Sequence, residues 1–412
     1  MSDGQQQQQQ QQRPSSLFSL LRLAQPNFRE FLINSNLFGE NSTDFNDMIT
    51  HSILTNNFSP QSPPSVNEGI LGECTFFSNH SRFVKGVDFS PRDDHIFCST
   101  GLDGKLIIYD ARFAKVKSTT PINFQGTISF SGLKFLHDGF RIALTTTSNK
   151  LLIYDIEKGI VVQNVDKCCS SVHSRTSIAV DPDTGIIMTP NLTGNGLSQI
   201  DIRTSSIVKS LDHLHTHQIN DIEILDRQWS DFYRQQQQLQ PTYNQHLQQN
   251  NNNIENLIMT VSSDTNCKIF DNQKNQIKEI SSRSPLYSIQ HTPEVPSQST
   301  SCLAIGGEKL GFYSIDGTLE QTFSCKGIVK LKYTKSGTKL FSAGNDGYVR
   351  LFSRFKRKHE LQGVVYRHSR DIQDMAMSRN DEYLVTASTD NKIGLIRIGD
   401  PIFGPSEYGN II

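Results

Sequence analysis

The sequence predicts an all-β protein in which seven small antiparallel sheets form one ring-shaped domain. The clearest unit, at 101–110, is a tight turn containing Asp between two apolar strands, the second ending in an aromatic residue and Asp. Without one insertion, the repeats are spaced by about 44 residues, which suits four strands per unit. The pattern recurs six times, at 145–155, 192–201, 262–271, 304–314, 344–353 and 388–397.

A second repeat supports this division. The tripeptide His-Ser-Arg begins at His80, His173 and His368, and an apolar residue follows seven positions after each histidine. These repeats are similar to those of the WD40 family of β-propellers, whose blades hold a buried hydrogen-bonded set of His, Ser or Thr, Asp and Trp. The resemblance implies a single seven-bladed WD40-type β-propeller over residues 69–398.

The resemblance also assigns structural hydrogen-bond sets, residue by residue. Blades 1, 4 and 7 offer His, Ser or Thr, and Asp, whereas blade 6 lacks the His. The Trp position holds Tyr109, Phe270, Phe352 and Ile396, and neither Phe nor Ile has a hydrogen-bond donor in its side chain. The expected members are His80, Ser99, Asp103, His215, Thr260, Asp264, Ser342, Asp346, His368, Thr386 and Asp390.

The segment before the ring divides into two parts. Residues 1–68 predict a disordered, low-complexity arm, which includes a run of glutamines at 5–12. Ser and Asn residues ahead of apolar side chains predict short helices within 15–38. Residues 70–77 predict a strand that pairs beside 393–397 and closes the ring, because closure removes the exposed edges of the sheets.

Blade 4 is interrupted by a second low-complexity tract. A Gln/Asn-rich insertion at 228–253 separates its first two strands and contains Trp229, the one tryptophan of the chain. We expect a loop here, because the entropy cost of closing a loop rises slowly with its length. The tail at 399–412 carries Pro and Gly residues and predicts irregular structure.

Composition limits the partners and the compartment. The formal net charge is −1, so no overall basic field favours direct contact with nucleic acid. No apolar run reaches the roughly 18 residues that cross a membrane, and the N-terminus is rich in glutamine rather than a signal peptide. We expect a cytoplasmic or nuclear protein that is a monomer within a larger complex.

Two groups of residues imitate catalytic or metal sites. His80, Ser99 and Asp103 have the residue types of a hydrolase triad, but the combination recurs in other blades and no Gly-x-Ser-x-Gly elbow is present. Alternate histidines at 213–217 could face a metal from one side of a strand. However, His215 aligns with the structural histidine of blade 4. We therefore predict no enzyme, no cofactor and no metal.

Two sets of arginines are candidates for partner binding. Arg82, Arg175 and Arg370 each follow a leading histidine by two positions, at one rim of the ring, where guanidinium groups could bind an acidic or phosphorylated ligand. Arg112 and Arg203 each follow Asp by two positions. Their turns resemble the Trp-Asp-x-Arg signature of propellers that are substrate receptors of cullin-4 ubiquitin ligases.

These observations predict a non-catalytic protein–protein interaction scaffold. The resemblance suggests, more narrowly, a substrate receptor that binds a cullin-4 adaptor. Two alternatives stay open. One is an assembly factor for a microtubule or ribonucleoprotein complex. The other is an enzyme or small-molecule binder that uses the central channel, which would require reactive side chains unique to that channel.

Overall fold

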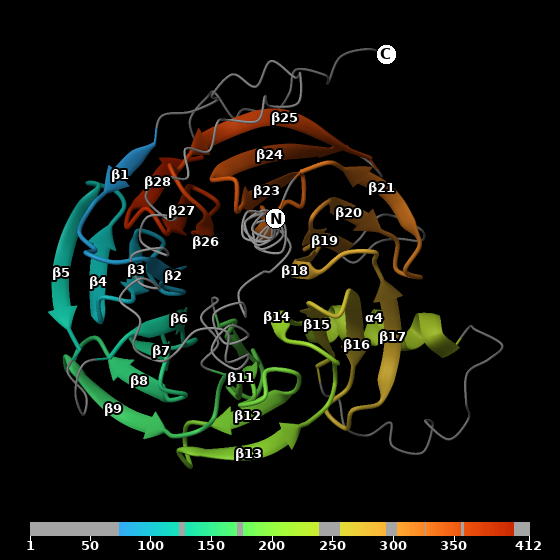
Figure 1. Cartoon of the computed structure of the whole chain (residues 1–412), viewed down its shortest axis with the longest axis horizontal. Helices are drawn as coiled ribbons and strands as arrows, with labels where there is room; N and C mark the ends of the chain where they lie inside the picture. The colour runs from blue at the N-terminus through green and yellow to red at the C-terminus, as the bar shows by residue number, and fades with distance from the viewer. Residues whose placement is uncertain are drawn as a thin grey trace, which may run out of the picture. The chain divides into compact units, whose positions relative to one another are not determined.

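The strands form seven four-stranded antiparallel sheets arranged as blades around a central channel (Figure 1). The computed structural model describes residues 74–122, 128–170, 176–238, 256–293, 303–325, 327–355 and 358–398. The arm at 1–68 with its expected helices at 15–38, and the tail at 399–412, lie outside the described residues. The predicted all-β, seven-bladed fold is confirmed in the part of the chain that is described.

The blades follow one another along the chain, and in each blade the first strand is innermost. The innermost strands are β2 (Val84–Phe89), β6 (Phe130–Phe135), β10 (Ala179–Val180), β14 (Ile219–Ile224), β18 (Leu286–His291), β22 (Ile328–Tyr333) and β26 (Ile372–Met377). The second strands are β3 (Ile96–Gly101), β7 (Arg141–Thr146), β11 (Ile187–Pro190), β15 (Ile258–Ser262), β19 (Leu303–Gly307), β23 (Lys339–Gly344) and β27 (Tyr383–Ser388).

The outer half of each blade is formed by its third and fourth strands. The third strands are β4 (Lys105–Asp110), β8 (Leu151–Asp155), β12 (Leu197–Asp201), β16 (Asn266–Phe270), β20 (Leu310–Tyr313), β24 (Tyr348–Phe355) and β28 (Ile393–Arg397). The outermost strands are β5 (Lys115–Pro121), β9 (Ile160–Val165), β13 (Ser206–Leu211), β17 (Gln276–Ser281), β21 (Leu319–Phe323), β25 (Lys358–Arg367) and β1 (Thr75–Phe77).

The burial of the strands explains why apolar residues fill the middle of each blade. Every residue of β8, β12 and β15 is buried, whereas five of the six residues of β13 are exposed. Neighbouring blades cover both faces of the second and third strands, so their side chains form the core between blades. Between blades 7 and 1, for example, the rings of Phe97 and Tyr109 stack with centroids 4.6 Å apart.

The ring is closed by a strand from the N-terminal side. Strand β1 pairs with β28 in blade 7, with Thr75 opposite Leu395 and Phe77 opposite Ile393. The predicted pairing is confirmed over these residues, while 70–73 lie outside the described part. Strand β1 comes from the N-terminal end of the domain, and β26, β27 and β28 come from its C-terminal end. Blade 7 therefore joins the two ends of the domain through main-chain hydrogen bonds.

The start of the blade 4 insertion differs from the expectation. Helix α4 (Arg227–Gln238) stands where we expected a loop; in Figure 1 it crosses behind β16 and β17 and extends beyond them. The carboxylate of Asp226 caps it by accepting the Trp229 backbone N–H at 2.9 Å. Trp229 and Tyr233 share one side of the helix and are buried in the core of blades 4 and 5. Their burial holds the helix against the propeller.

Candidate protein-interaction site

In blade 1, the predicted polar residues meet inside the sheet. His80 Nδ1 donates to the carboxylate of Asp103 at 2.9 Å, and His80 Nε2 lies 2.7 Å from Ser99 Oγ. The Tyr109 hydroxyl is 3.4 Å from the same Ser99 oxygen. Asp103 also accepts a hydrogen bond from the Ser81 backbone N–H. The set therefore links the turn between β3 and β4, which contains Asp103, to the loop that precedes β2.

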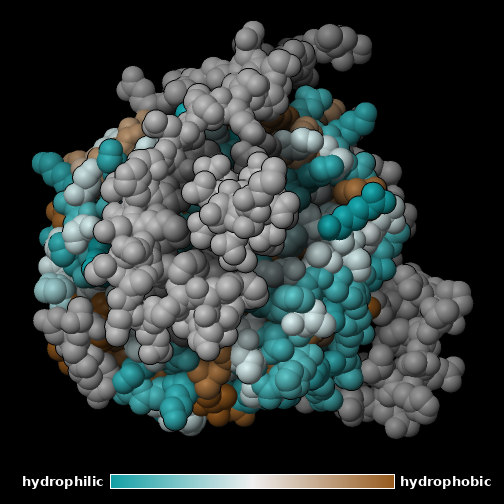
Figure 2. Space-filling view, in the orientation of Figure 1, coloured by the Kyte–Doolittle hydropathy of each residue, from teal (hydrophilic) through white to brown (hydrophobic). Residues whose placement is uncertain are grey.

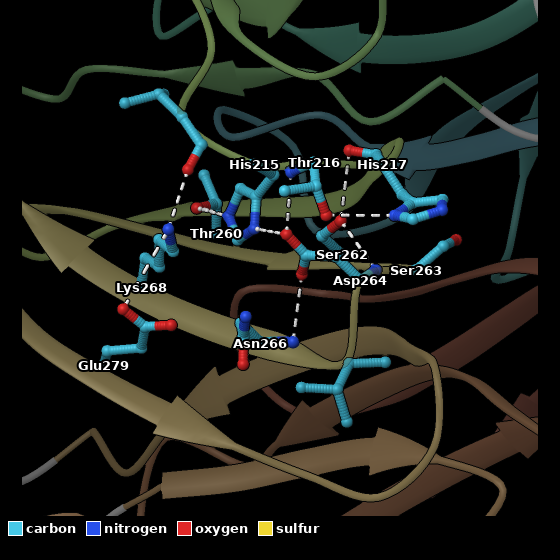
Figure 3. Close-up of polar contacts among 12 residues, drawn as sticks. His215, Thr216, His217, Thr260, Ser262, Ser263, Asp264, Asn266, Lys268 and Glu279 are labelled. Atoms are coloured by element: carbon cyan, nitrogen blue, oxygen red, sulfur yellow. Dashed lines mark hydrogen bonds and ion pairs between the residues drawn. The ribbon is translucent and has the colours of Figure 1, made fainter.

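Blade 4 repeats this geometry (Figure 3). His215 Nδ1 donates to Asp264 at 2.9 Å, and its Nε2 lies 2.8 Å from Thr260 Oγ1. The backbone N–H groups of Thr216 and Asn266 also donate to the Asp264 carboxylate. The carboxylate therefore has partners on both sides of the turn, which is the arrangement that a buried acidic group requires.

Blade 7 completes its set in a way that its own sequence does not indicate. His368 bonds to Asp390 at 3.0 Å and to Thr386 at 2.7 Å. Ile396 stands at the aromatic position and offers no donor, but the Tyr366 hydroxyl lies 2.7 Å from Thr386 Oγ1. Tyr366 comes from β25, the outermost strand of blade 6, so a neighbouring blade supplies the missing hydroxyl.

Blade 6 uses a different arrangement. Asp346 forms an ion pair with Arg350, whose Nη2 lies 2.7 Å from Oδ2, and this arginine side chain is almost fully buried. Ser342 Oγ is buried without a hydrogen-bond partner in the described structure. Ser342 and Asp346 are therefore not joined into one set, and an arginine occupies the role expected of histidine. The sequence signal was available, since Arg350 follows Asp346 by four residues.

The electrostatics of the sets stabilise ionised carboxylates. Burial alone would raise the pKa of Asp264, but the hydrogen bond and charge of His215 outweigh it and hold the pKa at about 2. The pKa of Asp390 is likewise held at about 2 by His368, against the effect of burial. Both imidazole nitrogens in each set are bonded within the sheet, and the hydroxyl-bearing residues Ser99, Thr260 and Thr386 are fully buried.

The alternate histidines of blade 4 have separate surroundings. His215 lies in the buried set, while His217 Nδ1 contacts the hydroxyl of its neighbour Thr216 at 3.0 Å (Figure 3). His213 has a left-handed backbone, with φ of 57°, so the segment is not the extended strand that would align the three rings. The described residues contain no cluster of three or more His, Cys, Asp or Glu side chains suited to a metal ion.

Arg112 and Arg203 adopt the same local structure. Arg112 follows β4 and donates to Asp110, with Nη2 2.8 Å from Oδ2; Arg203 follows β12 and pairs with Asp201 at 2.7 Å. In both turns the arginine backbone N–H also bonds to the same carboxylate. The guanidinium groups remain partly exposed, and Phe113, 65% exposed, lies beside Arg112.

The antiparallel order of the strands divides the loops between two faces. Turns after third strands and connections from first to second strands share one face, so Arg112, Arg203 and α4 belong to the same side of the ring. Arg82 and Arg370 are exposed in the loops before first strands, on the opposite side. Arg175 lies outside the described residues, so the structure does not bring the three arginines of this set together.

Most of the visible face is hydrophilic in its described part (Figure 2). The brown, apolar residues appear there in small separate groups. Among the described residues, no helix is long and apolar enough to cross a membrane. In its described part, the face seen in Figure 2 has mixed polarity, which is common for protein interfaces that are not obligate.

Comparison with known proteins agrees with the fold. The WD domain, G-beta repeat (WD40) sequence model matches residues 72–110 and 359–396. A segment of 85 residues, 21% of the chain, is 33% identical to "WD repeat-containing protein 44" of Xenopus laevis and covers 9% of that protein. A segment of 86 residues, 20% of the chain, is 30% identical to "Protein NEDD1" of Mus musculus, covering 12% of it.

A solved structure extends the likeness to the whole ring. A chain of "Crystal Structure of Mitotic Checkpoint Complex" superposes with a TM-score of 0.62 at 14% identity, covering 82% of this chain and 95% of that one. The protein is thus a β-propeller whose blades are sequence repeats. It carries WD40 repeats at residues 72–110 and 359–396, and its described part forms seven blades.

Proposed function

We propose that this protein is a non-catalytic scaffold that binds other proteins in the cytoplasm or nucleus. The observation that carries the proposal is that the His–Ser/Thr–Asp sets recur in three blades with their Ser or Thr fully buried, where a substrate does not reach the hydroxyl. In blade 1, both ring nitrogens of His80 and the carboxylate of Asp103 are bonded within the sheet. The residues that resemble a catalytic triad therefore hold the blade together. The exposed loops of both faces are left to make contacts.

Within this class, the protein is a substrate receptor of a cullin-4 ubiquitin ligase. The paired turns of Arg112 and Arg203 support this proposal, because two separate blades present the same Asp-x-Arg geometry on one face. Each guanidinium is oriented by its own Asp, so little side-chain freedom remains to be lost on binding. Phe113 adds an exposed aromatic group to this surface.

The test is co-purification with a cullin-4 adaptor. Arg112→Ala combined with Arg203→Ala should remove adaptor recovery, because buried arginine anchors commonly contribute about 2 kcal/mol or more to an interface. Arg82→Ala combined with Arg370→Ala is the matched control, since these exposed arginines lie on the opposite face. Circular dichroism should show that both double variants are folded.

Two outcomes separate the ligase from the general scaffold. If the unmodified protein recovers no cullin-4 adaptor, or the Arg112/Arg203 variant recovers as much as the control variant, the receptor proposal fails. Recovery of subunits of a microtubule or ribonucleoprotein complex in the same experiment would favour an assembly factor. If the unmodified protein enriches no protein over a control without bait, the scaffold proposal itself is refuted.

A further inference from the structure

Four cationic side chains are exposed on the face of the ring that carries the leading histidines. Loops before first strands and turns from second to third strands share this face, because neighbouring strands of a blade are antiparallel. The four belong to blades 6, 7 and 1, which follow one another around the ring: Arg367 at the end of β25, Arg370 before β26, Lys392 before β28 and Arg82 before β2. We call this surface the basic rim.

Main-chain contacts hold the loops of the basic rim in place. The His368 backbone N–H donates to the carbonyl of Gly347 at 2.9 Å, which joins the leading loop of blade 7 to a turn of blade 6. The Ser388 hydroxyl donates to the carbonyl of Asp371 at 3.0 Å within blade 7. The loop that contains Arg82 follows β1, which is itself paired in blade 7. The cations therefore lie on an ordered surface, so little backbone ordering is needed when a ligand binds.

The carboxylates around the basic rim leave an excess of positive charge at the surface. Three of them accept hydrogen bonds from histidine or arginine inside the blades: Asp103, Asp346 and Asp390. Asp371 is exposed, and it interacts with the charges of Lys85 and Arg370. Within the ranges that the structure describes, no carboxylate is close enough to form an ion pair with any of the four cations.

Aromatic side chains lie among these cations. The guanidinium of Arg367 is 4.8 Å from the centroid of the Tyr348 ring, a cation–π contact that orients it. Phe83, in the loop before β2, is 37% exposed. Phe76 is 41% exposed and packs edge-on against the His368 ring, with ring centroids 5.2 Å apart. The basic rim therefore offers apolar surface beside its charges.

We propose that the basic rim is a binding site for a phosphorylated peptide segment of a partner protein. A guanidinium group presents paired donors that match phosphate oxygens, and clusters of arginine are a recurrent means of recognising phosphorylated motifs. Phe76 and Phe83 contact the apolar side chains that flank the phosphate. This surface lies on the opposite face of the ring from Arg112 and Arg203, so the proposal does not depend on the cullin-4 proposal.

Two observations favour a peptide over a nucleic acid. A site for single-stranded nucleic acid needs a positively charged groove that follows the backbone, with aromatic rings on which successive bases stack. The cations of the basic rim are confined to one part of the ring, and the net charge of the chain is −1. A short phosphorylated segment therefore matches this surface better than a long polyanion does.

Fluorescence anisotropy of a labelled peptide tests the proposal on the full chain, at constant ionic strength and at a pH where the phosphate is a dianion. The probe carries two phosphoserines between leucines, and the same peptide with unmodified serines is its reference. The phosphopeptide should bind about tenfold or more tightly than the reference, because each phosphate adds charge-assisted hydrogen bonds.

Arg82→Ala combined with Arg370→Ala should weaken phosphopeptide binding about tenfold or more, because hydrogen bonds to a charged group are lost. Arg112→Ala combined with Arg203→Ala is the matched control, since it also removes two exposed arginines, but on the opposite face. Arg82→Lys combined with Arg370→Lys keeps the charges and should bind the phosphopeptide more tightly than the Arg82/Arg370 alanine variant.

Circular dichroism checks that each variant is folded. A short single-stranded RNA in the same assay separates a phosphopeptide site from a general site for polyanions. The proposal is overturned if the phosphopeptide binds no more tightly than the reference peptide, or if the RNA binds as tightly as the phosphopeptide. It is also overturned if the folded Arg82/Arg370 alanine variant binds the phosphopeptide as tightly as the Arg112/Arg203 variant.

Discussion

Asp103→Ala should destabilise the whole propeller by about 3 kcal/mol. The Asp103 side chain is 2% exposed and accepts hydrogen bonds from His80 Nδ1 and the backbone N–H groups of Ser81 and Lys105. Its removal leaves the buried His80 nitrogen and the less buried N–H groups of Ser81 and Lys105 without this acceptor. A buried group that loses its partner costs about 1–3 kcal/mol, and the two backbone groups add to the loss at His80, which places the estimate near the upper end.

Equilibrium urea unfolding gives the measurement. The one tryptophan, Trp229, is fully buried in the core of blades 4 and 5, whereas Asp103 belongs to blade 1. If the ring unfolds as one unit, Trp229 fluorescence and far-UV circular dichroism should report the same lowered midpoint. Lys117→Ala, an exposed change in the same blade, should stay within about 0.5 kcal/mol of the parent. Equal midpoints for the two variants would refute the reasoning.

Two further predictions concern closure and acid. Phe77→Ala should lower the free energy of unfolding in urea by about 3 kcal/mol, because the Phe77 ring is buried against Tyr109 with ring centroids 4.9 Å apart. Phe76→Ala is the control, since Phe76 is 41% exposed, and it should cost less than half as much. Equal costs would contradict the closing role of β1. Stability should fall between pH 4 and pH 2, because the pKa values of Asp264 and Asp390 are about 2 when folded and 3.8 otherwise. Their contribution is complete above the higher value and is lost as the pH falls through the lower one; an Asp264→Asn and Asp390→Asn double variant should lose less stability over this range.

The sequence was sufficient for the fold, and it has His, Ser or Thr, and Asp at matching positions in three blades. Each repeat encodes its turn, its two apolar strands and the spacing of His, Ser or Thr, and Asp, all of which are local. The closing strand could also be predicted, since an apolar segment such as 75–77 before the first blade has an edge to cover. The local sequence pattern of each repeat is consistent with the structure of the whole ring, and this consistency allows the fold of a repeat protein to be predicted from its sequence.

Features that depend on a neighbouring blade were not predictable in the same way. Tyr366 contacts Thr386 from another sheet. Trp229 lies on a helix that is packed against blades 4 and 5, and the Gln-rich composition around it did not predict that helix. Aligning one repeat with another does not reveal such relations, because they arise when the ring closes.

The links between blades also bear on how the propeller responds to change. The backbone N–H of Phe135 in blade 2 donates to Asp88 in blade 1 at 2.9 Å, and that of Val87 donates to Asp374 in blade 7. Lys330 of blade 6 reaches Asp221 of blade 4 across the channel side of blade 5. A side chain of one blade thus completes the main-chain hydrogen bonding of the next, so losing it affects two sheets. Substitutions in the inner strands should therefore couple between blades, whereas those in the exposed outer strands should act almost independently.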